Sequence, residues 1–301
     1  MSRFVKAGGR DIRVEGHLIR IARLDGEKYR FLENPEAILK GLRASRNRVD
    51  LFTFVQRLPE TQPKYSYPME WDNFAALPIT TFEHWWTNQI GFKARNKAKQ
   101  ANKHGVYLRE IPFSDELVRG IWEIYNETPI RQGKRFPHYG MTLEQVHNYA
   151  ATFLNDSVFI GAFFADKIIG FVKLTIDESH TQAGLMHILS MVSHRDKAPT
   201  NALLAQAIRS CAERKLDYLV YSNFAYGNKN SDSLSDFKER NGFQRINVPR
   251  YYVPLTLLGS FAYRMGCHRK LTDIVPESYI TGLREIRSAW YRRRLETNKS
   301  I

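Results

Sequence analysis

The feature that most constrains the fold is a regular succession of apolar segments between residues 158 and 255. Residues 158–164 and 168–176 form two apolar runs joined by Ala165-Asp166-Lys167, which predicts a tight β-hairpin. The pattern then predicts a strand over 183–192, a helix from Pro199 to about residue 215, a strand over 218–224, a helix over 231–241 and a strand over 243–255. We therefore expect an α/β (α+β) protein with a twisted mixed sheet flanked by helices.

The pattern upstream of residue 158 is less regular. It predicts strands over 17–22, 49–55 and 106–111, and helices over 36–46, 82–104, 114–127 and 142–154. Residues 59–80 contain four prolines, which favours a long connection there, and residues 128–139 are expected to form a loop. We expect three parts: an N-terminal α/β part (1–105), a second α/β domain (106–258) and a basic C-terminal extension (259–301) with a helix over 277–299.

The charge of the chain is strongly positive. Lys and Arg number 45 against 31 Asp and Glu, giving a formal net charge of +14. Such a balance favours anionic partners such as nucleic acid, phosphorylated cofactors or substrates, or an acidic membrane surface. The basic runs at 93–103 and 284–294 fit a polyanion, although charged runs on helices are commonly solvated faces.

Cysteine content and hydropathy limit the other classes of protein. Two cysteines, Cys211 and Cys267, imply neither a disulfide framework nor a metal cluster. The most apolar stretch, 158–172, is interrupted by Asp166-Lys167 and is too short to span a bilayer. No apolar signal core follows Met1. We therefore expect a cytoplasmic protein without a transmembrane segment or a metal, and its oligomeric state stays open.

Several short motifs resemble the GNAT acetyltransferase superfamily. The segment Ser235-Asp-Phe-Lys-Glu-Arg-Asn-Gly-Phe243 is similar to the helix end near the close of GNAT domains, and it follows the expected order of strands and helices. Arg95–Val106, Tyr125–Gly133 and the pair Phe237-Lys238 look more like the Fem-type peptidyltransferases and their acetyltransferase-like relatives. The resemblance covers roughly residues 90–255, and it implies a GNAT-like catalytic domain preceded by a degenerate GNAT-like part.

The resemblance implies an acyl-CoA co-substrate, with acetyl-CoA as the first choice. Its phosphates would lie at the start of the helix that begins at Pro199, where free N–H groups and the helix dipole attract anions. The strands 183–192 and 218–224 are expected to splay apart and admit the donor. The expected donor contacts are Met191, Val192, Ser193, Arg195, Lys197, Thr200 and Asn201. The chain departs from the usual phosphate loop because residues 194–202 contain no glycine.

Three residues are candidates for catalysis. Glu178 and His187 are possible bases for an acceptor amine, and Lys238 stands where acetyltransferases keep a proton-donating tyrosine. Lys238 is expected to point into the cleft and stabilise an oxyanion or a phosphate. The alternatives are a structural turn carboxylate, a core histidine and an exposed helix lysine. The expected acceptor contacts are Arg131, Arg135, His138 and Tyr139.

Three functions fit these residues. The first is an N-acyltransferase that moves an acyl group from acyl-CoA to the amine of a small molecule or peptide. The second is a Fem-like aminoacyl or peptidyl transferase that uses aminoacyl-tRNA, which the +14 charge and Phe237-Lys238 favour. The third is a non-catalytic binding protein that kept the fold. Fold alone does not choose among them.

Overall fold

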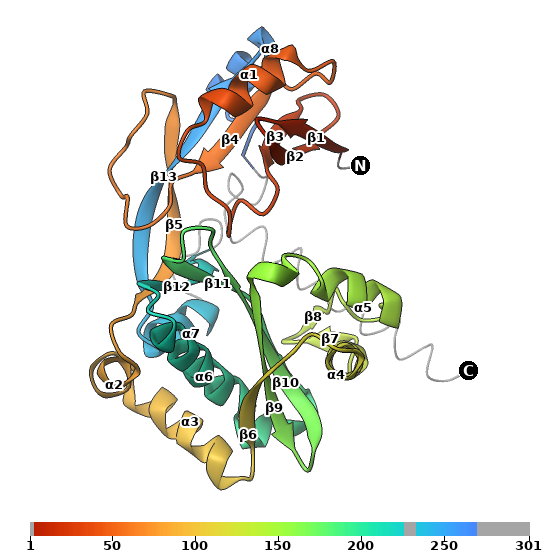
Figure 1. Cartoon of the computed structure of the whole chain (residues 1–301), viewed down its shortest axis with the longest axis vertical. Coiled ribbons are helices and arrows are strands. Elements are labelled where there is room, and N and C mark those ends of the chain that lie inside the picture. The colour runs from red at the N-terminus through yellow and green to blue at the C-terminus, as the bar shows by residue number, and fades with distance from the viewer. Residues whose placement is uncertain (1–2, 226–232, 270–301) are drawn as a thin grey trace.

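A computed structural model describes residues 3–225 and 233–269 of the chain. Within this part, one mixed sheet of eleven strands runs through the molecule (Figure 1). Its order is β1 (Arg3–Ala7), β2 (Arg10–Glu15), β3 (Ile21–Leu24), β4 (Leu51–Val55), β13 (Gln244–Pro254), β5 (Met69–Pro78), β12 (Tyr218–Asn223), β11 (Gln182–Ser190), β10 (Lys167–Ile176), β9 (Ser157–Phe164) and β6 (Tyr107–Ile111).

Helices cover both faces of the sheet where it carries β9–β11. The helix α6 packs on these three strands, and α4 contacts β10. Figure 1 shows β1–β4, α1 and α8 at one end of the molecule, joined to the rest by the long strands β5 and β13. The helices are α1 (Glu36–Ala44), α2 (Phe82–His84), α3 (Phe92–Lys103), α4 (Asp115–Asn126), α5 (Leu143–Ala150), α6 (Pro199–Glu213), α7 (Ser233–Arg240) and α8 (Leu257–Arg264).

The predicted order of elements over 158–255 is confirmed, as is the mixed α/β class. β9 and β10 form the expected hairpin, and its two turn residues, Ala165 and Asp166, have φ of 46° and 59°. Pro199 is the first residue of α6, where its fixed φ suits the helix and its missing N–H costs nothing. The predicted helix over 277–299 lies outside the described residues.

The prediction of a long connection over 59–80 is wrong, because ten of these residues form β5. Pro59, Pro63 and Pro68 all precede this strand and Pro78 is its last residue, so the prolines bound the strand and do not interrupt it. β5 pairs with β13 on one side and β12 on the other. It therefore connects the expected N-terminal part to the expected second domain, and the sheet runs across the boundary predicted at residue 105.

Three other predictions of local structure are also wrong. The segment 128–139, expected to form a loop, contains a short hairpin of β7 (Ile130–Arg131) and β8 (Lys134–Arg135). Residues 82–104 are not one helix: α2 continues into a π-helical turn, Trp85–Gln89, and α3 starts after Gly91. The Gly91 N–H donates to the carbonyl of Arg240, the last residue of α7, at 2.8 Å. The residue that precedes α3 is therefore held by a contact that is distant in sequence. Residues 3–24 hold three strands where one was expected.

Candidate functional site

β11 and β12 separate soon after they pair. Their parallel pairing covers three positions, from Gln182↔Tyr218 to Gly184↔Val220, although each strand continues further. A cleft of about 960 Å³ opens beyond this point, between the end of β11, the start of α6 and the residues 221 and 233–241. The splay predicted from the sequence is confirmed.

The lining of this cleft combines apolar and basic side chains. The apolar part includes Phe136, Ile188, Leu189, Met191 and Phe237. The charged residues that line it, among those the structure describes, are all basic: Lys93 and Lys97 of α3, Arg131, Lys134 and Arg135 of the segment 128–139, Arg195 before α6, and Arg240 at the end of α7. We call this space the basic cleft, and its charge suits a ligand that carries phosphate.

The N-terminus of α6 lies at the wall of the basic cleft. Ala198 precedes the helix with φ 53°, and Thr200 and Asn201 of the first turn line the cleft. The N–H groups of a helix's first turn have no partner within the helix, and the helix dipole is positive at this end. This wall can therefore receive an anion without a glycine-rich loop.

The backbone N–H groups just after β11 donate hydrogen bonds to a carboxylate. Glu127 accepts hydrogen bonds from Val192 N–H at 2.6 Å and from the N–H and hydroxyl of Ser193 at 2.8 and 2.7 Å. Arg131 pairs with the same carboxylate and donates to the Ser190 carbonyl at 2.7 Å. Burial tends to raise the pKa of Glu127, but these hydrogen bonds and Arg131 lower it overall. We call this arrangement the Glu127 clamp.

Five of the seven expected donor contacts line the basic cleft: Met191, Val192, Arg195, Thr200 and Asn201. Ser193 and Lys197 are placed differently. Ser193 is held by the Glu127 clamp, and Lys197 pairs with Asp196 at 3.1 Å while its Nζ lies 4.8 Å from the centre of the Phe164 ring. The N–H groups of Val192 and Ser193, expected to hold the donor, are thus already hydrogen-bonded within the protein.

The four residues expected to contact the acceptor lie in three different places. Arg131 and Arg135 line the basic cleft. His138 stacks on Tyr125, with ring centres 4.5 Å apart, and lies 6.0 Å from His187. Tyr139 is exposed.

Of the three catalytic candidates, none is among the described residues that line the basic cleft. Lys238, expected to point into it, is fully buried: its Nζ donates to the Asn223 carbonyl and lies 5.0 Å from the centre of the Tyr221 ring. Tyr221 and Phe237 do line the cleft, so Lys238 supports its wall.

His187 lies among aromatic rings next to the segment 128–139. Its ring centre is 5.1 Å from that of Tyr149 and 6.3 Å from that of Phe171. Burial, with His138 and Lys173 nearby, lowers the pKa of His187 to about 3. The imidazole is therefore neutral at physiological pH, but so low a pKa is far from the optimum for a general base.

The buried Lys173, opposite His187 in the β10–β11 pairing, was not expected from the sequence as a site residue. Its Nζ donates to the carbonyl oxygens of Ala150 and Thr152, at the C-terminal end of α5, where a cation is favoured. Burial lowers the pKa of Lys173 to about 8. A lysine inside a run of apolar strand residues is unusual, and that is the signal that could have drawn attention to it.

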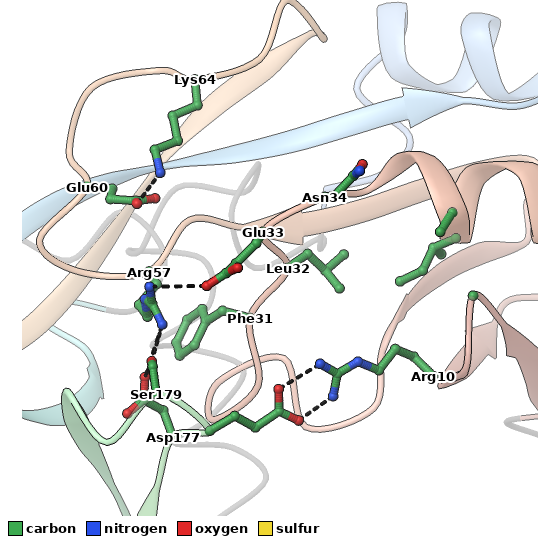
Figure 2. Close-up of a pocket in the computed structure, with 14 residues that line it drawn as sticks. Arg10, Phe31, Leu32, Glu33, Asn34, Arg57, Glu60, Lys64, Asp177 and Ser179 are labelled. Atoms are coloured by element: carbon green, nitrogen blue, oxygen red, sulfur yellow. Dashed lines mark hydrogen bonds and ion pairs between the residues drawn. The ribbon is translucent and has the colours of Figure 1, made fainter.

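Glu178 lies in a different place, a cavity of about 540 Å³ between the β10–β11 turn and the N-terminal strands. β11 starts at Gln182 and first lines the basic cleft at Ile188, so about 20 Å separate this end of the strand from that cleft, at about 3.3 Å per residue. Figure 2 shows this space, which we call the junction cavity. The Arg10 guanidinium donates to both carboxylate oxygens of Glu178, one of them at 2.7 Å.

The other charges of the junction cavity are paired in the same way. Arg57 contacts Ser179 and Asp177 on one side and Glu33 on the other, and Lys64 pairs with Glu60 (Figure 2). Arg10 lowers the pKa of Glu178 through its hydrogen bonds. A carboxylate held in this way is a poor proton acceptor at neutral pH, so the cavity fastens the turn 177–181 to the N-terminal strands.

Within residues 3–225 and 233–269, we find no group of three or more His, Cys, Asp or Glu side chains placed to hold a metal ion. The helices of the same part of the chain are all too short or too polar to cross a bilayer.

Comparisons with known proteins identify the fold. The sequence matches no family model and no curated protein. Among solved structures, the C-terminal DUF2156 domain of a putative lysylphosphatidylglycerol synthetase from Agrobacterium fabrum is similar, with a TM-score of 0.57 and 12% identity over 87% of each chain. The structure of L-PGS from Bacillus licheniformis has a TM-score of 0.57 and 12% identity, covering 89% of this chain and 90% of that one. FemX has a TM-score of 0.55 and 10% identity, covering 88% and 90%.

This chain shares the fold of FemX and L-PGS. The resemblance that the short motifs gave is therefore confirmed at the level of the fold. The likeness also extends beyond residues 90–255, since it covers nearly nine tenths of the chain.

Proposed function

We propose that this chain is an acyltransferase that takes its acyl group from a phosphate-bearing donor bound in the basic cleft and passes it to an amine. The observation that carries this proposal is the cleft itself. Strands β11 and β12 separate beside the start of α6, and the described charged residues around the opening are basic. A cleft lined by both apolar and cationic side chains suits a donor with an acyl group at one end and phosphates at the other.

Direct transfer of the acyl group does not need a covalent intermediate on the protein. The amine nitrogen attacks the acyl carbonyl, the bond from the carbonyl carbon to the donor's sulfur or oxygen breaks, and a proton passes from the amine to the leaving group. The protein has to bind the donor's phosphates, orient the carbonyl and exclude water. The cations that line the basic cleft, including Lys93 and Arg195, would hold the phosphates. Ile188 and Met191 would contact the acyl group.

Two donors have the required chemistry. Acyl-CoA, with acetyl-CoA first, is the donor of the GNAT enzymes that the motifs resemble. Aminoacyl-tRNA is the second candidate, and two observations favour it. The Glu127 clamp already uses the N–H groups of Val192 and Ser193. The exposed residues Lys93 and Lys97 of α3 also add to the cations of the cleft, where the backbone of a longer polyanion would contact them.

The solved structures with the same fold fit a transferase of this kind. One group is named for making lysylphosphatidylglycerol, a molecule that carries an aminoacyl group. The sequence identity to these two structures is 12%, so the likeness alone does not assign their substrates to this chain.

The test is calorimetric titration of the full chain with acetyl-CoA and, separately, with bulk aminoacylated tRNA. We expect one of the two to bind, and Arg195→Ala to weaken that binding by about tenfold, because a charge-assisted contact of about 1.5 kcal/mol is lost. Tyr107→Phe, on an exposed strand of the far edge, serves as the control. Binding of neither donor, or equal binding by Arg195→Ala, would overturn the proposal. Donor binding without acyl transfer to any amine would instead support a non-catalytic binding protein.

A further inference from the structure

The helix α8 leaves an apolar face uncovered among the residues that the structure describes. Leu257 is 91% exposed, Phe261 59% and Met265 63%, and Leu258 is partly exposed beside them. The spacing of these residues places them on one side of the helix. The opposite side packs on the sheet, where Gly259 lies against the Asp50 carbonyl and Ala262 is buried.

A buried carboxylate fixes this face relative to two loops. Asp50, which is fully buried, accepts hydrogen bonds from the Arg20 N–H at 2.9 Å, the Arg48 guanidinium at 2.9 Å and the Thr256 hydroxyl at 2.8 Å. The first turn of α8 and the segments 16–20 and 45–50 therefore meet at one point. The segment 16–20 adds Leu18, which is 85% exposed.

The exposed charged side chains of these three segments are basic, and two of them, Arg48 and Arg269, pair with Asp50 and Glu70. Residues 16–20, 45–50 and 256–269 contain five arginines, and their one acidic residue is the buried Asp50. Arg46 and Arg264 are exposed. We call the exposed part of these segments the α8 surface.

We propose that the α8 surface docks on an anionic membrane surface. Apolar side chains fixed on a rigid helix, flanked by arginines and with no exposed carboxylate among the three segments, match the composition of an interfacial membrane-binding site. Anionic lipid headgroups complement the arginines, and the acyl boundary receives Leu257 and Phe261. A second copy of the chain suits the surface less well, because a symmetric contact would bring the same arginines against one another.

The docking does not depend on the proposed function. The surface lies at the end of the molecule that carries α1 and α8, away from the basic cleft between β11 and β12 (Figure 1). The failure of either proposal therefore leaves the other standing.

The experiment is cosedimentation of the full chain with vesicles of phosphatidylcholine alone and of phosphatidylcholine and phosphatidylglycerol in equal parts. We expect binding to the anionic vesicles, weaker binding to the neutral ones, and a loss of binding as salt is raised. The double variant Leu257→Gln/Phe261→Gln should bind anionic vesicles at least about tenfold more weakly, because two exposed side chains no longer enter the lipid. Leu143→Gln, an exposed leucine on α5, is the matched control and should bind as the wild type does.

Three results would overturn the proposal. The first is a wild-type chain that binds neither vesicle, and the second is a double variant that binds as well as the wild type. The third is a wild-type dimer, seen by analytical ultracentrifugation, that the double variant converts to a monomer, since the α8 surface would then be an interface between copies. Circular dichroism should show the double variant folded, because both substituted side chains are exposed.

Discussion

The basic cleft and the junction cavity both contain several charged side chains, but they use them in opposite ways. In the junction cavity, Arg10, Arg57 and Lys64 each meet a carboxylate of the same cavity. In the basic cleft, the described charged residues of the lining are all cations, and only carboxylates outside the lining pair with any of them, as Glu127 does with Arg131 and Asp236 with Arg240. A cavity whose charges neutralise one another holds two parts of the chain together, whereas a cleft of one sign attracts a ligand of the other. The number of charges in a pocket is thus a weaker guide to a site than their balance.

The largest effect is expected in the basic cleft. Lys93→Ala combined with Arg195→Ala should raise the dissociation constant of the donor by about 100-fold, because each cation contributes about tenfold when its contact with phosphate is lost. Calorimetry measures the constant, with the donor that binds the wild type. The matched control, Arg57→Ala in the junction cavity, should leave it unchanged. A similar loss of donor affinity in both variants would contradict the proposed difference between the two pockets.

The second effect concerns Glu127, a carboxylate beside the basic cleft that is not part of its lining. Glu127→Ala should lower the free energy of unfolding by about 2 kcal/mol at neutral pH, because the N–H groups of Val192 and Ser193 and the Arg131 guanidinium lose their acceptor. Glu127→Gln keeps an acceptor oxygen and should lose about half as much.

The pH dependence of the Glu127 clamp has a definite sign. Its pKa is lower in the folded protein than in the unfolded one, so its stabilisation is complete above the ordinary glutamate pKa of 4.5 and is lost as the pH falls further. Denaturant unfolding at neutral pH and near pH 3 should show the difference between wild type and Glu127→Gln shrinking in acid. A difference that does not change with pH would mean that the clamp does not depend on charge.

The third effect concerns His187, an imidazole beside the segment 128–139 that stays neutral because burial lowers its pKa. The pKa of His187 is about 3 in the folded protein, against an ordinary value of 6.5. The stability linked to this shift is complete above pH 6.5 and falls as the pH drops from 6.5 towards 3. His187→Gln should therefore flatten the acid limb of the stability curve, by about 1–2 kcal/mol at pH 5. Unfolding measured at pH 7 and pH 5 checks this, and parallel curves for the two proteins would contradict it.

The smallest effect is expected in the junction cavity. Arg10 and Glu178 are 36% and 43% exposed, and solvent screens such pairs, so a double-mutant cycle of Arg10→Ala and Glu178→Gln should give a coupling of less than about 1 kcal/mol. Acyl transfer should be unchanged in Glu178→Gln. If this variant instead lost its activity, Glu178 would be the base that the sequence suggested, and the catalytic site would lie in the junction cavity.

The region from residue 158 onward was predictable because its signals are local. Alternating apolar residues, the short turn at Ala165-Asp166, the proline that opens α6 and the glycine after α7 each specify the structure of their own neighbourhood. The separation of β11 and β12, which the family resemblance implied, is also observed, and five of the expected donor contacts line the basic cleft. Their contact with a donor stays a prediction.

Other features were decided by the tertiary structure alone. β5 follows a proline-rich stretch, and its pairing with β12 and β13 makes it a strand of the central sheet. Glu127 and Ser193 are 66 residues apart in sequence, and Arg10 and Glu178 are 168 apart. No local pattern encodes such contacts, because they form only when the topology of the sheet brings distant segments together. The sequence by itself determined which segments become strands and helices near the cleft and that their surface is basic. The packing of the whole chain decided which charges stay available to a ligand, because only there does each side chain meet its partner.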